Sequence, residues 1–160
     1  MPIQTGEKMP SGVFGIMTDT GPGAISTKEL FEGKKVVLVS VPGAFTRTCS
    51  SKHLPGFLSR ADDIVAKGVD TIAFMAVNDL SVMDAWGQHQ EVGSKILMLA
   101  DGNGEYAEAL GIIYDGSPFG MGMRGSRSAF IVEDGVATHV ALESPGKFEV
   151  SSAESILAAL

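Results

Sequence analysis

Apolar runs of strand length recur along the chain and set its predicted framework. Three of them carry no regular polar alternation: Lys35–Val41, Val69–Val77 and Ile96–Ala100. Runs of this kind are typical of strands that are buried on both faces in the middle of a sheet. A fourth run, Gly12–Met17, predicts a short strand near the N-terminus, and the Gly21–Pro22 pair after it predicts a turn.

Helix signals separate these apolar runs. The predicted helices are Thr27–Phe31, Leu54–Lys67, Val82–Glu91, Glu105–Leu110 and Ser152–Leu160, with a further helix opening at Thr46. Ser26 and Glu29 form a capping-box pattern before the first of them. Ser81 together with Asp84 is the predicted cap of the third. Pro55 is expected either to start a helix separate from the preceding one or to kink it.

The C-terminal third predicts a hairpin. Ser128–Glu133 and Val136–Leu142 read as strands, and the Asp134–Gly135 pair between them is a strong hairpin signal. The preceding Asp115–Gly125 segment is rich in glycine and methionine and is predicted to be a loop. Strands that alternate with helices, followed by a hairpin and a helix, predict an α/β fold with a mixed central sheet flanked by helices. At 160 residues, the chain is predicted to be one domain spanning residues 1–160.

The only cysteine, Cys49, lies at the start of the helix that Thr46 is predicted to open. No acidic residue occurs between Glu32 and Asp62, although the chain carries a net charge of −7. The basic residues in this interval are Lys34, Lys35, Arg47, Lys52 and Arg60. A helix N-terminus and a local positive field both favour the thiolate form of a cysteine. The alternative is a buried and inert cysteine, which is what most single cysteines are.

Pro42, Thr46 and Cys49 form a P-x-x-x-T-x-x-C pattern, which resembles the signature of peroxiredoxins. Three longer stretches are similar to the type-five, or type-two D, subfamily: Val39–Phe57, Val77–Gly87 and Met123–Val136. Arg47 departs from the pattern, because relatives often carry proline there. A second departure is that the resolving cysteine of many relatives is absent.

The resemblance implies a thioredoxin fold, here with an N-terminal strand extension, and a homodimer. The βαβ portion with a cysteine at a helix start, followed by ββα, is also the order of elements of that fold. The implied activity is a thiol peroxidase that reduces hydrogen peroxide and alkyl hydroperoxides through a sulfenic acid on Cys49. No cofactor and no metal are expected.

The reaction needs hydrogen-bond donors around the sulfur as well as the thiolate. Thr46 is expected to place its hydroxyl near the sulfur and the peroxide, and to cap the helix at the same time. Pro42 ends a strand and is expected to shield the site from water. The resemblance assigns the family's catalytic arginine to Arg124. Arg127 is expected either to support it or to be an ordinary surface arginine.

Two alternative functions remain open at this point. Cys49 and His53 are four residues apart and share a helix face, which is compatible with a cysteine–histidine hydrolase. Against this, no oxyanion-stabilising or orienting residue is evident in the sequence. The simpler expectation for His53 is a structural role or modest support of the positive field. The other alternative is a non-catalytic binding module with the thioredoxin fold, in which Cys49 is incidental.

The cysteine count also limits the partners. Because no second cysteine is present, the sulfenic acid must be reduced by an external thiol, either glutathione with glutaredoxin or thioredoxin. An isoelectric point near 4.8 argues against nucleic-acid binding. No apolar run reaches the length of a membrane span, and the N-terminus shows no apolar leader. We therefore expect a cytoplasmic protein with no membrane partner.

Other patterns are weaker. Gly120–Gly125 matches G-x-G-x-x-G but leads into a predicted strand, so it fails the context of a dinucleotide-binding loop. Asp101–Glu105 resembles the start of a calcium loop but lacks glycine at the sixth position, which favours a plain turn. Trp86 is expected in the core. The apolar residues of the late loop, Phe119, Met121 and Met123, are candidates for an apolar rim or a dimer face.

Overall fold

The computed structural model describes all residues, Met1–Leu160. The strands are β1 (Val13–Thr18), β2 (Gly21–Ser26), β3 (Lys35–Ser40), β4 (Thr71–Ala76), β5 (Leu97–Ala100), β6 (Ile113–Asp115), β7 (Met123–Gly125), β8 (Ser128–Glu133) and β9 (Val136–Leu142). The helices are α1 (Thr27–Phe31), α2 (Leu54–Ser59), α3 (Ala61–Ala66), α4 (Leu80–His89), α5 (Glu105–Ala109) and α6 (Ala153–Ala159). A π-helical turn, η1 (Cys49–His53), precedes α2, and a 3₁₀ turn, η2 (Ser117–Phe119), joins β6 to β7.

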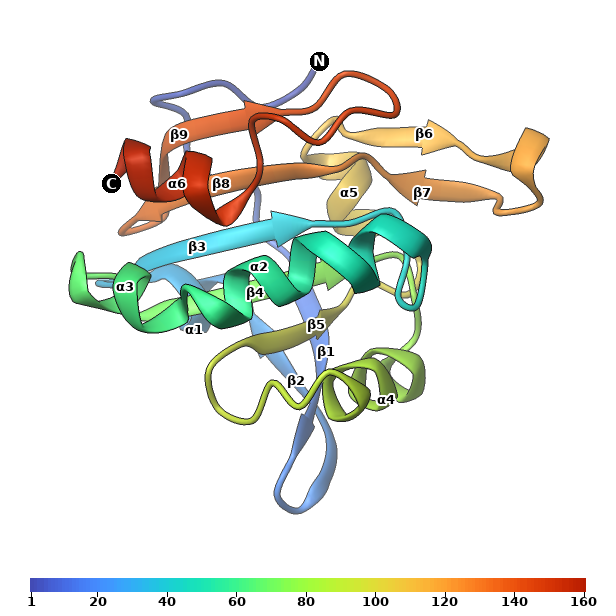
Figure 1. Ribbon diagram of the computed structural model, residues 1–160, viewed down its shortest axis with the longest axis horizontal. Helices are drawn as coiled ribbons and strands as arrows, with labels where there is room; N and C mark the ends of the chain where they lie inside the picture. Colours follow the sequence, from blue (N-terminus) through green and yellow to red (C-terminus); the bar gives the residue numbers. More distant parts are fainter.

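Seven strands form one mixed sheet in the order β2-β1-β5-β4-β3-β8-β9 (Figure 1). Strands β3, β4 and β5 run parallel, and β1, β8 and β9 join antiparallel to their neighbours. In the centre, Val39 of β3 lies opposite Phe74 of β4 and Ala129 of β8. The predicted α/β fold with a mixed central sheet is confirmed.

The two faces of the sheet carry two separate apolar cores. Side chains alternate along a strand, so Val37 and Val39 of β3 enter one core while Val36 and Leu38 enter the other. Helices α2, α3, α4 and α6 cover the first face, and Cys49 belongs to that core. Helices α1 and α5 cover the second face. This double coverage is the reason that the central strands read as continuous apolar runs.

Three strands escaped prediction. The segment predicted as a turn at Gly21–Pro22 is the start of β2, which pairs with β1 alone. An edge strand tolerates Pro22 because one side of its ladder needs no donor. Within the predicted loop lie β6 and β7, which form a separate two-stranded ribbon that extends beyond the main sheet (Figure 1). Each has only three residues, too few for a periodic pattern.

Two helix predictions also need correction. The predicted helix Leu54–Lys67 is divided into α2 and α3 at Arg60, whose backbone (φ −107°, ψ 8°) leaves the helical region. The cap of α4 is Asp79, whose carboxylate accepts from the Val82 N–H, and not Ser81. No helix of the structure is both long and apolar enough to cross a membrane.

Candidate active site

The cysteine lies in the first turn of a helix and is fully buried. Helical structure begins at Arg47, and the Ser50 N–H donates to the Thr46 carbonyl at 2.9 Å. The Cys49 side chain has 0% exposure. Backbone N–H groups of a first turn have no partner within the helix, and they give that end a partial positive charge. The predicted placement of Cys49 at a helix start is confirmed.

A π-helical turn follows the cysteine and ties it to α4. The Leu54 N–H donates to the Cys49 carbonyl, and Pro55 has no N–H to continue the pattern. The Ser50 carbonyl accepts from Gln90 Nε2 at 3.0 Å, while the Ser50 hydroxyl accepts from Trp86 Nε1, also at 3.0 Å. Pro55 therefore lies in the first turn of α2, where the π turn gives way to the α-helix without a break in the helical backbone. Trp86 is fully buried, as expected.

Arg127 is the arginine that contacts the sulfur. It lies between β7 and β8, and its Nη2 donates to Cys49 Sγ at 3.3 Å. Its Nη1 donates to His53 Nδ1 at 2.7 Å. The residue that the sequence left as a support or a plain surface arginine thus joins the cysteine and the histidine.

Arg124 does not reach the sulfur, which corrects the expectation for it. Its Nε donates to the Met121 carbonyl at 2.8 Å and its Nη1 to the Val77 carbonyl at 3.0 Å. It remains next to the cysteine loop, because a Cβ built on Gly43 would lie 3.4 Å from Arg124 Nη1. The physical reason is position: Arg124 lies inside the β6–β7 ribbon opposite Tyr114, four residues before Ser128, where the chain enters the main sheet.

The pairing of β8 with β3 explains the position of Arg127. The predicted hairpin strand pairs antiparallel with β3, so its first residue, Ser128, lies opposite the last residue of β3, Ser40. The residue before Ser128 must therefore lie near the loop that follows β3, which carries Pro42 and Cys49. The pairing register places Arg127 there, whereas the sequence offered it only as a supporting residue or an ordinary surface arginine.

His53 is held as a neutral imidazole in one tautomer. Arginine has donors only, so Nδ1 must accept from Arg127, and Nε2 donates to the Ser151 carbonyl at 2.8 Å. Burial lowers the pKa of His53 to about 4, and the charge of Arg127 acts in the same direction. The hydrogen bond to Ser151 and the charge of Glu143 oppose this shift but are outweighed. At neutral pH, His53 therefore carries no charge.

This arrangement disfavours the hydrolase alternative. A general base must have a free ring nitrogen toward its nucleophile. Both nitrogens of His53 are engaged, and the Arg127 guanidinium donates to both Nδ1 and the cysteine sulfur.

The loop before the cysteine is fixed at several points. The Thr46 hydroxyl donates to the Gly43 carbonyl at 2.7 Å and accepts no backbone N–H of the following turn, so the predicted helix cap is not formed. The Ala44 N–H donates to Asn78 Oδ1 at 2.8 Å, which ties the loop to the end of β4. Phe45 adopts a positive φ of 62°, an uncommon conformation for a bulky residue. With its O–H committed to Gly43, the Thr46 oxygen keeps acceptor capacity for a ligand.

A groove of about 680 Å³ opens beside Arg127. Its lining combines cyclic side chains (Pro42, Tyr114, Phe119, Pro145, Phe148) with two cations, Arg127 and Lys147, the Glu143 carboxylate and several hydroxyl residues. Burial raises the pKa of Tyr114, so its phenol stays protonated at neutral pH. The groove thus offers aromatic walls beside Arg127, whose guanidinium contacts the buried sulfur.

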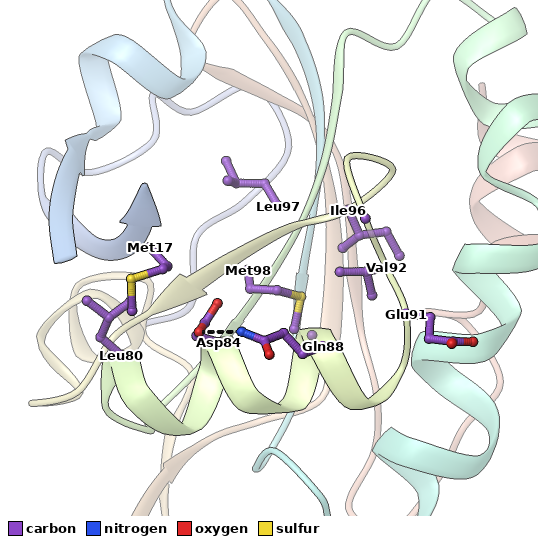
Figure 2. A pocket seen from close by; sticks show the side chains of 11 residues that line it. Met17, Leu80, Asp84, Gln88, Glu91, Val92, Ile96, Leu97 and Met98 are labelled. Atoms are coloured by element: carbon purple, nitrogen blue, oxygen red, sulfur yellow. Dashed lines mark hydrogen bonds between the residues drawn. The ribbon is translucent and has the colours of Figure 1, made fainter. Parts of the chain in front are cut away.

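A second, smaller pocket lies between α4 and β5 and has different chemistry. Its volume is about 240 Å³, and Met17, Leu80 and Met98 supply apolar lining (Figure 2). Its polar residues include Asp84, which accepts from Gln88 Nε2 at 2.8 Å. It contains no cysteine or histidine. The groove at Arg127 differs from it because one of its lining residues, Arg127, contacts the cysteine sulfur.

Comparison with known proteins agrees with this geometry. The family described as Redoxin matches residues 4–157. Peroxiredoxin-2E-2, chloroplastic, of Oryza sativa subsp. japonica is 46% identical over 164 residues, which cover 99% of this chain and 72% of that protein. The chain belongs to the peroxiredoxin family. A peroxiredoxin is a thiol peroxidase, so the enzyme class expected from the sequence is confirmed.

Solved structures show the same fold. Reduced Prx3 from Vibrio vulnificus in complex with H₂O₂ has a TM-score of 0.94 and 49% identity to this peroxiredoxin, and 98% of each chain is covered. A Burkholderia cenocepacia structure described as a putative thioredoxin reductase has a TM-score of 0.98 at 41% identity, covering 100% of this chain and 99% of that one. The thioredoxin fold of the peroxiredoxins is thus confirmed for this chain.

Proposed function

We propose that this peroxiredoxin reduces hydrogen peroxide and alkyl hydroperoxides at Cys49, with the peroxide held between Thr46 and Arg127. The observation that carries the proposal is the 3.3 Å contact from Arg127 Nη2 to Cys49 Sγ. A donor at that distance from the sulfur also lies near any oxygen that approaches the sulfur in line. The V. vulnificus relative, whose structure holds H₂O₂, supports hydrogen peroxide as one substrate.

The chemical step is a displacement at oxygen. The Cys49 thiolate attacks one peroxide oxygen, an S–O bond forms and the O–O bond breaks. The sulfur is oxidised by two electrons to sulfenic acid, and the peroxide is reduced to water or an alcohol once its leaving oxygen takes up a proton. Negative charge moves from the sulfur to that leaving oxygen, so a fixed donor such as Arg127 stabilises the transition state.

The remaining site residues have supporting roles in this proposal. Thr46 accepts a hydrogen bond from the peroxide, because its own hydroxyl hydrogen is engaged by Gly43. Pro42 forms the groove wall and keeps water from the sulfur. Arg124 joins the segment at Met121 to Val77 by two hydrogen bonds and adds positive charge without touching the sulfur. The aromatic walls of the groove accommodate the organic part of an alkyl hydroperoxide.

The sulfenic acid is returned to the thiol by an external thiol, glutathione with glutaredoxin or thioredoxin. The first reductant thiol forms a mixed disulfide with Cys49 and releases water; a second thiol then releases the reduced enzyme and a disulfide product. Support comes from the single cysteine, which excludes an internal disulfide. A disulfide between two Cys49 residues needs two buried sulfurs to become accessible and meet, whereas a small thiol such as glutathione has to reach only one.

The test is mass spectrometry after one equivalent of peroxide with glutathione present. We expect one added glutathione on Cys49 and no addition in the Cys49→Ser variant. In the absence of a thiol, excess peroxide should add two or three oxygen atoms, because nothing internal protects the sulfenic acid. A quantitative covalent dimer on a non-reducing gel would contradict the external-thiol route.

We also propose a homodimer that uses the apolar rim of the site. Phe45, Phe119 and Met123 are 50%, 81% and 52% exposed, and large apolar residues at such exposure are typical of interaction surfaces. Met121 lies close to Gly43, so the ribbon tip and the cysteine loop are neighbours. Analytical ultracentrifugation of the wild type and of Phe119→Glu is the test: we expect a dimer that the variant weakens.

For the compartment we propose the cytoplasm. The single thiol suits a reducing environment. The rice relative is chloroplastic, so the competing location is an organelle. Cell fractionation with an antibody against the chain separates the two.

A further inference from the structure

The guanidinium on the sulfur is held without any carboxylate in contact with it. Buried or active-site arginines are commonly fixed by bidentate carboxylates. The ion pairs of this protein involve Lys28, Lys35, Arg60 and Lys95, and Arg127 is in none of them. Its orienting partner is neutral His53.

We propose that Glu143 is a positioning residue for the peroxidase reaction: through the Phe148–Ser151 segment and His53, it fixes the Arg127 guanidinium against Cys49. The inference rests on the proposed role of Arg127 and extends it to a residue in the C-terminal segment. Nothing in the sequence motif includes Glu143, which follows β9 directly.

The first link is a carboxylate that organises a turn of main chain. Glu143 Oε2 accepts the N–H groups of Glu149, Val150 and Ser151, each at 2.8 Å, and the Ser151 hydroxyl at 2.7 Å. Burial alone would raise the pKa of Glu143, but the hydrogen bonds from Ser151 and its neighbours outweigh it and hold the pKa below its ordinary value. Glu143 is therefore charged at neutral pH, and charge-assisted bonds of this kind are the strong ones.

The second link joins that segment to the active site by two contacts. The Ser151 carbonyl accepts from His53 Nε2, which leaves the Nδ1 lone pair for Arg127. The Phe148 ring lies 4.9 Å from the His53 ring and 5.9 Å from the Arg127 guanidinium carbon, measured to the Phe148 centroid. Fixing the segment thus fixes both the imidazole and one face of the guanidinium.

The indirect route has an electrostatic advantage. A carboxylate in direct contact with Arg127 would occupy its donors and cancel its positive charge beside the sulfur. The Glu143 carboxylate is instead bound by the Glu149–Ser151 N–H groups and the Ser151 hydroxyl, so the donors of Arg127 are left free, although the Glu143 N–H itself donates to the Arg127 carbonyl at 3.1 Å. The chain of contacts orients the guanidinium while leaving its donors available to the thiolate and the peroxide.

The first test compares two substitutions of the histidine. Asn places an amide oxygen near the position of Nδ1 and can still accept from Arg127, whereas Leu cannot accept. We expect His53→Leu to slow peroxide reduction about 10²-fold, the scale of a misplaced catalytic group, and His53→Asn to recover a large part of that loss. Equal rates in the two variants would contradict the role assigned to His53.

The second test removes the charge of Glu143. We expect Glu143→Gln to slow peroxide reduction about tenfold, which is less than the effect of losing the alignment of Arg127 completely. The control is Glu154→Gln, which changes an exposed acid of the same C-terminal segment and should react like the wild type. Alkylation by iodoacetamide, which needs the thiol but no aligned peroxide, should change less than the peroxide rate. Circular dichroism at the assay temperature confirms that each variant is folded. A wild-type peroxide rate in Glu143→Gln overturns the proposal.

A double-mutant comparison separates positioning from general destabilisation. If Glu143 acts through Arg127, then Glu143→Gln should not slow peroxide reduction further in an Arg127→Ala background. An equal slowing in both backgrounds would show a merely structural role and overturn the inference, even though the role of Arg127 would stand. A wild-type rate in Arg127→Ala itself would instead overturn the role of Arg127 and this inference with it.

Discussion

The two arginines near the cysteine, Arg124 and Arg127, are three residues apart and have different partners. Arg124 gives its hydrogen bonds to main-chain carbonyls, of Met121 in its own ribbon and of Val77 after β4. Arg127 gives its hydrogen bonds to the sulfur of Cys49 and to an imidazole. Neither is neutralised by a carboxylate, so both keep their positive charge.

The difference shows that an arginine can contribute to the site in two separate ways: by positive charge near the sulfur, or by a hydrogen bond donated to the sulfur itself. Both guanidinium groups add positive charge near Cys49, whereas the sequence analysis attributed the positive field to the basic residues that flank the cysteine in the chain. Only Arg127 has a donor on the sulfur, where charge changes during reaction. Arg124 joins the β6–β7 ribbon to the end of β4 and so shapes the groove wall. The comparison predicts a large kinetic effect from one arginine and a stability effect from the other.

The largest effect is expected for Arg127→Ala. Loss of one donor to a developing anion typically slows a reaction about 10²–10³-fold. Arg127→Lys should stay well below the wild-type rate, because an ammonium cannot contact the sulfur and His53 with one planar fork. Stopped-flow fluorescence of Trp86 against hydrogen peroxide measures both variants. A rate in Arg127→Ala close to that of the wild type would remove the basis of the comparison.

The next effect concerns His53, which accepts from Arg127 only while it is neutral. Its pKa is about 4 in the folded protein against an ordinary 6.5. As the pH falls between these values, the unfolded chain binds a proton that the folded chain does not, so stability is lost. The loss amounts to about 3 kcal/mol. Urea unfolding from pH 7 to pH 4 should show this loss relative to His53→Asn, and parallel curves for the two proteins would contradict it.

Much of the fold was predictable because its signals are local. The runs that became β3, β4 and β5 are apolar on both faces, and Asp134–Gly135 marks the hairpin whatever lies around it. Strands such as β2 are stabilised by pairing with a neighbouring strand, and their own residues show no apolar pattern that would predict a strand. Pro22 favoured the prediction of a turn, because proline is tolerated in a strand mainly at a sheet edge and the sequence could not show that this strand lies at an edge.

The site divides in the same way. Pro42, Thr46 and Cys49 lie in one short stretch, and their spacing identified them. Arg127 required the register of β8 against β3. Glu143 acts through the main-chain N–H of Ser151, and Ser151 meets His53 across 98 residues of sequence. A contact made through the backbone carries no residue-type signal, which is why no motif pointed to Glu143.

Arg124→Ala tests the other half of the comparison. The substitution leaves the carbonyls of Met121 and Val77 without their donor, and we expect a loss of about 1–3 kcal/mol in the free energy of unfolding. Arg60→Ala, which removes an exposed ion pair with Asp63, should cost at most about 1 kcal/mol. Peroxide reduction by folded Arg124→Ala should slow only a few-fold, because no donor to the sulfur is lost. A slowing as large as that of Arg127→Ala would show that both arginines act on the peroxide.

The smallest effect on stability is expected for Gly43→Ala, in the part of the cysteine loop that lies next to Arg124. A Cβ at Gly43 would lie 3.1 Å from Thr46 Cγ2 and 3.4 Å from Arg124 Nη1, so Gly43→Ala must shift the Thr46 side chain by a few tenths of an ångström. We expect the free energy of unfolding to fall by about 1 kcal/mol, the low end of overpacking costs, and peroxide reduction to slow several-fold because the Thr46 hydroxyl moves with its methyl group. Gly56→Ala is the matched control, since a Cβ there meets nothing within 4 Å. It should react like the wild type and gain up to about 1 kcal/mol from helix propensity. If Gly43→Ala reacts at the wild-type rate, then the exact position of the Thr46 hydroxyl does not affect peroxide reduction. In that case Arg127 alone must align the peroxide.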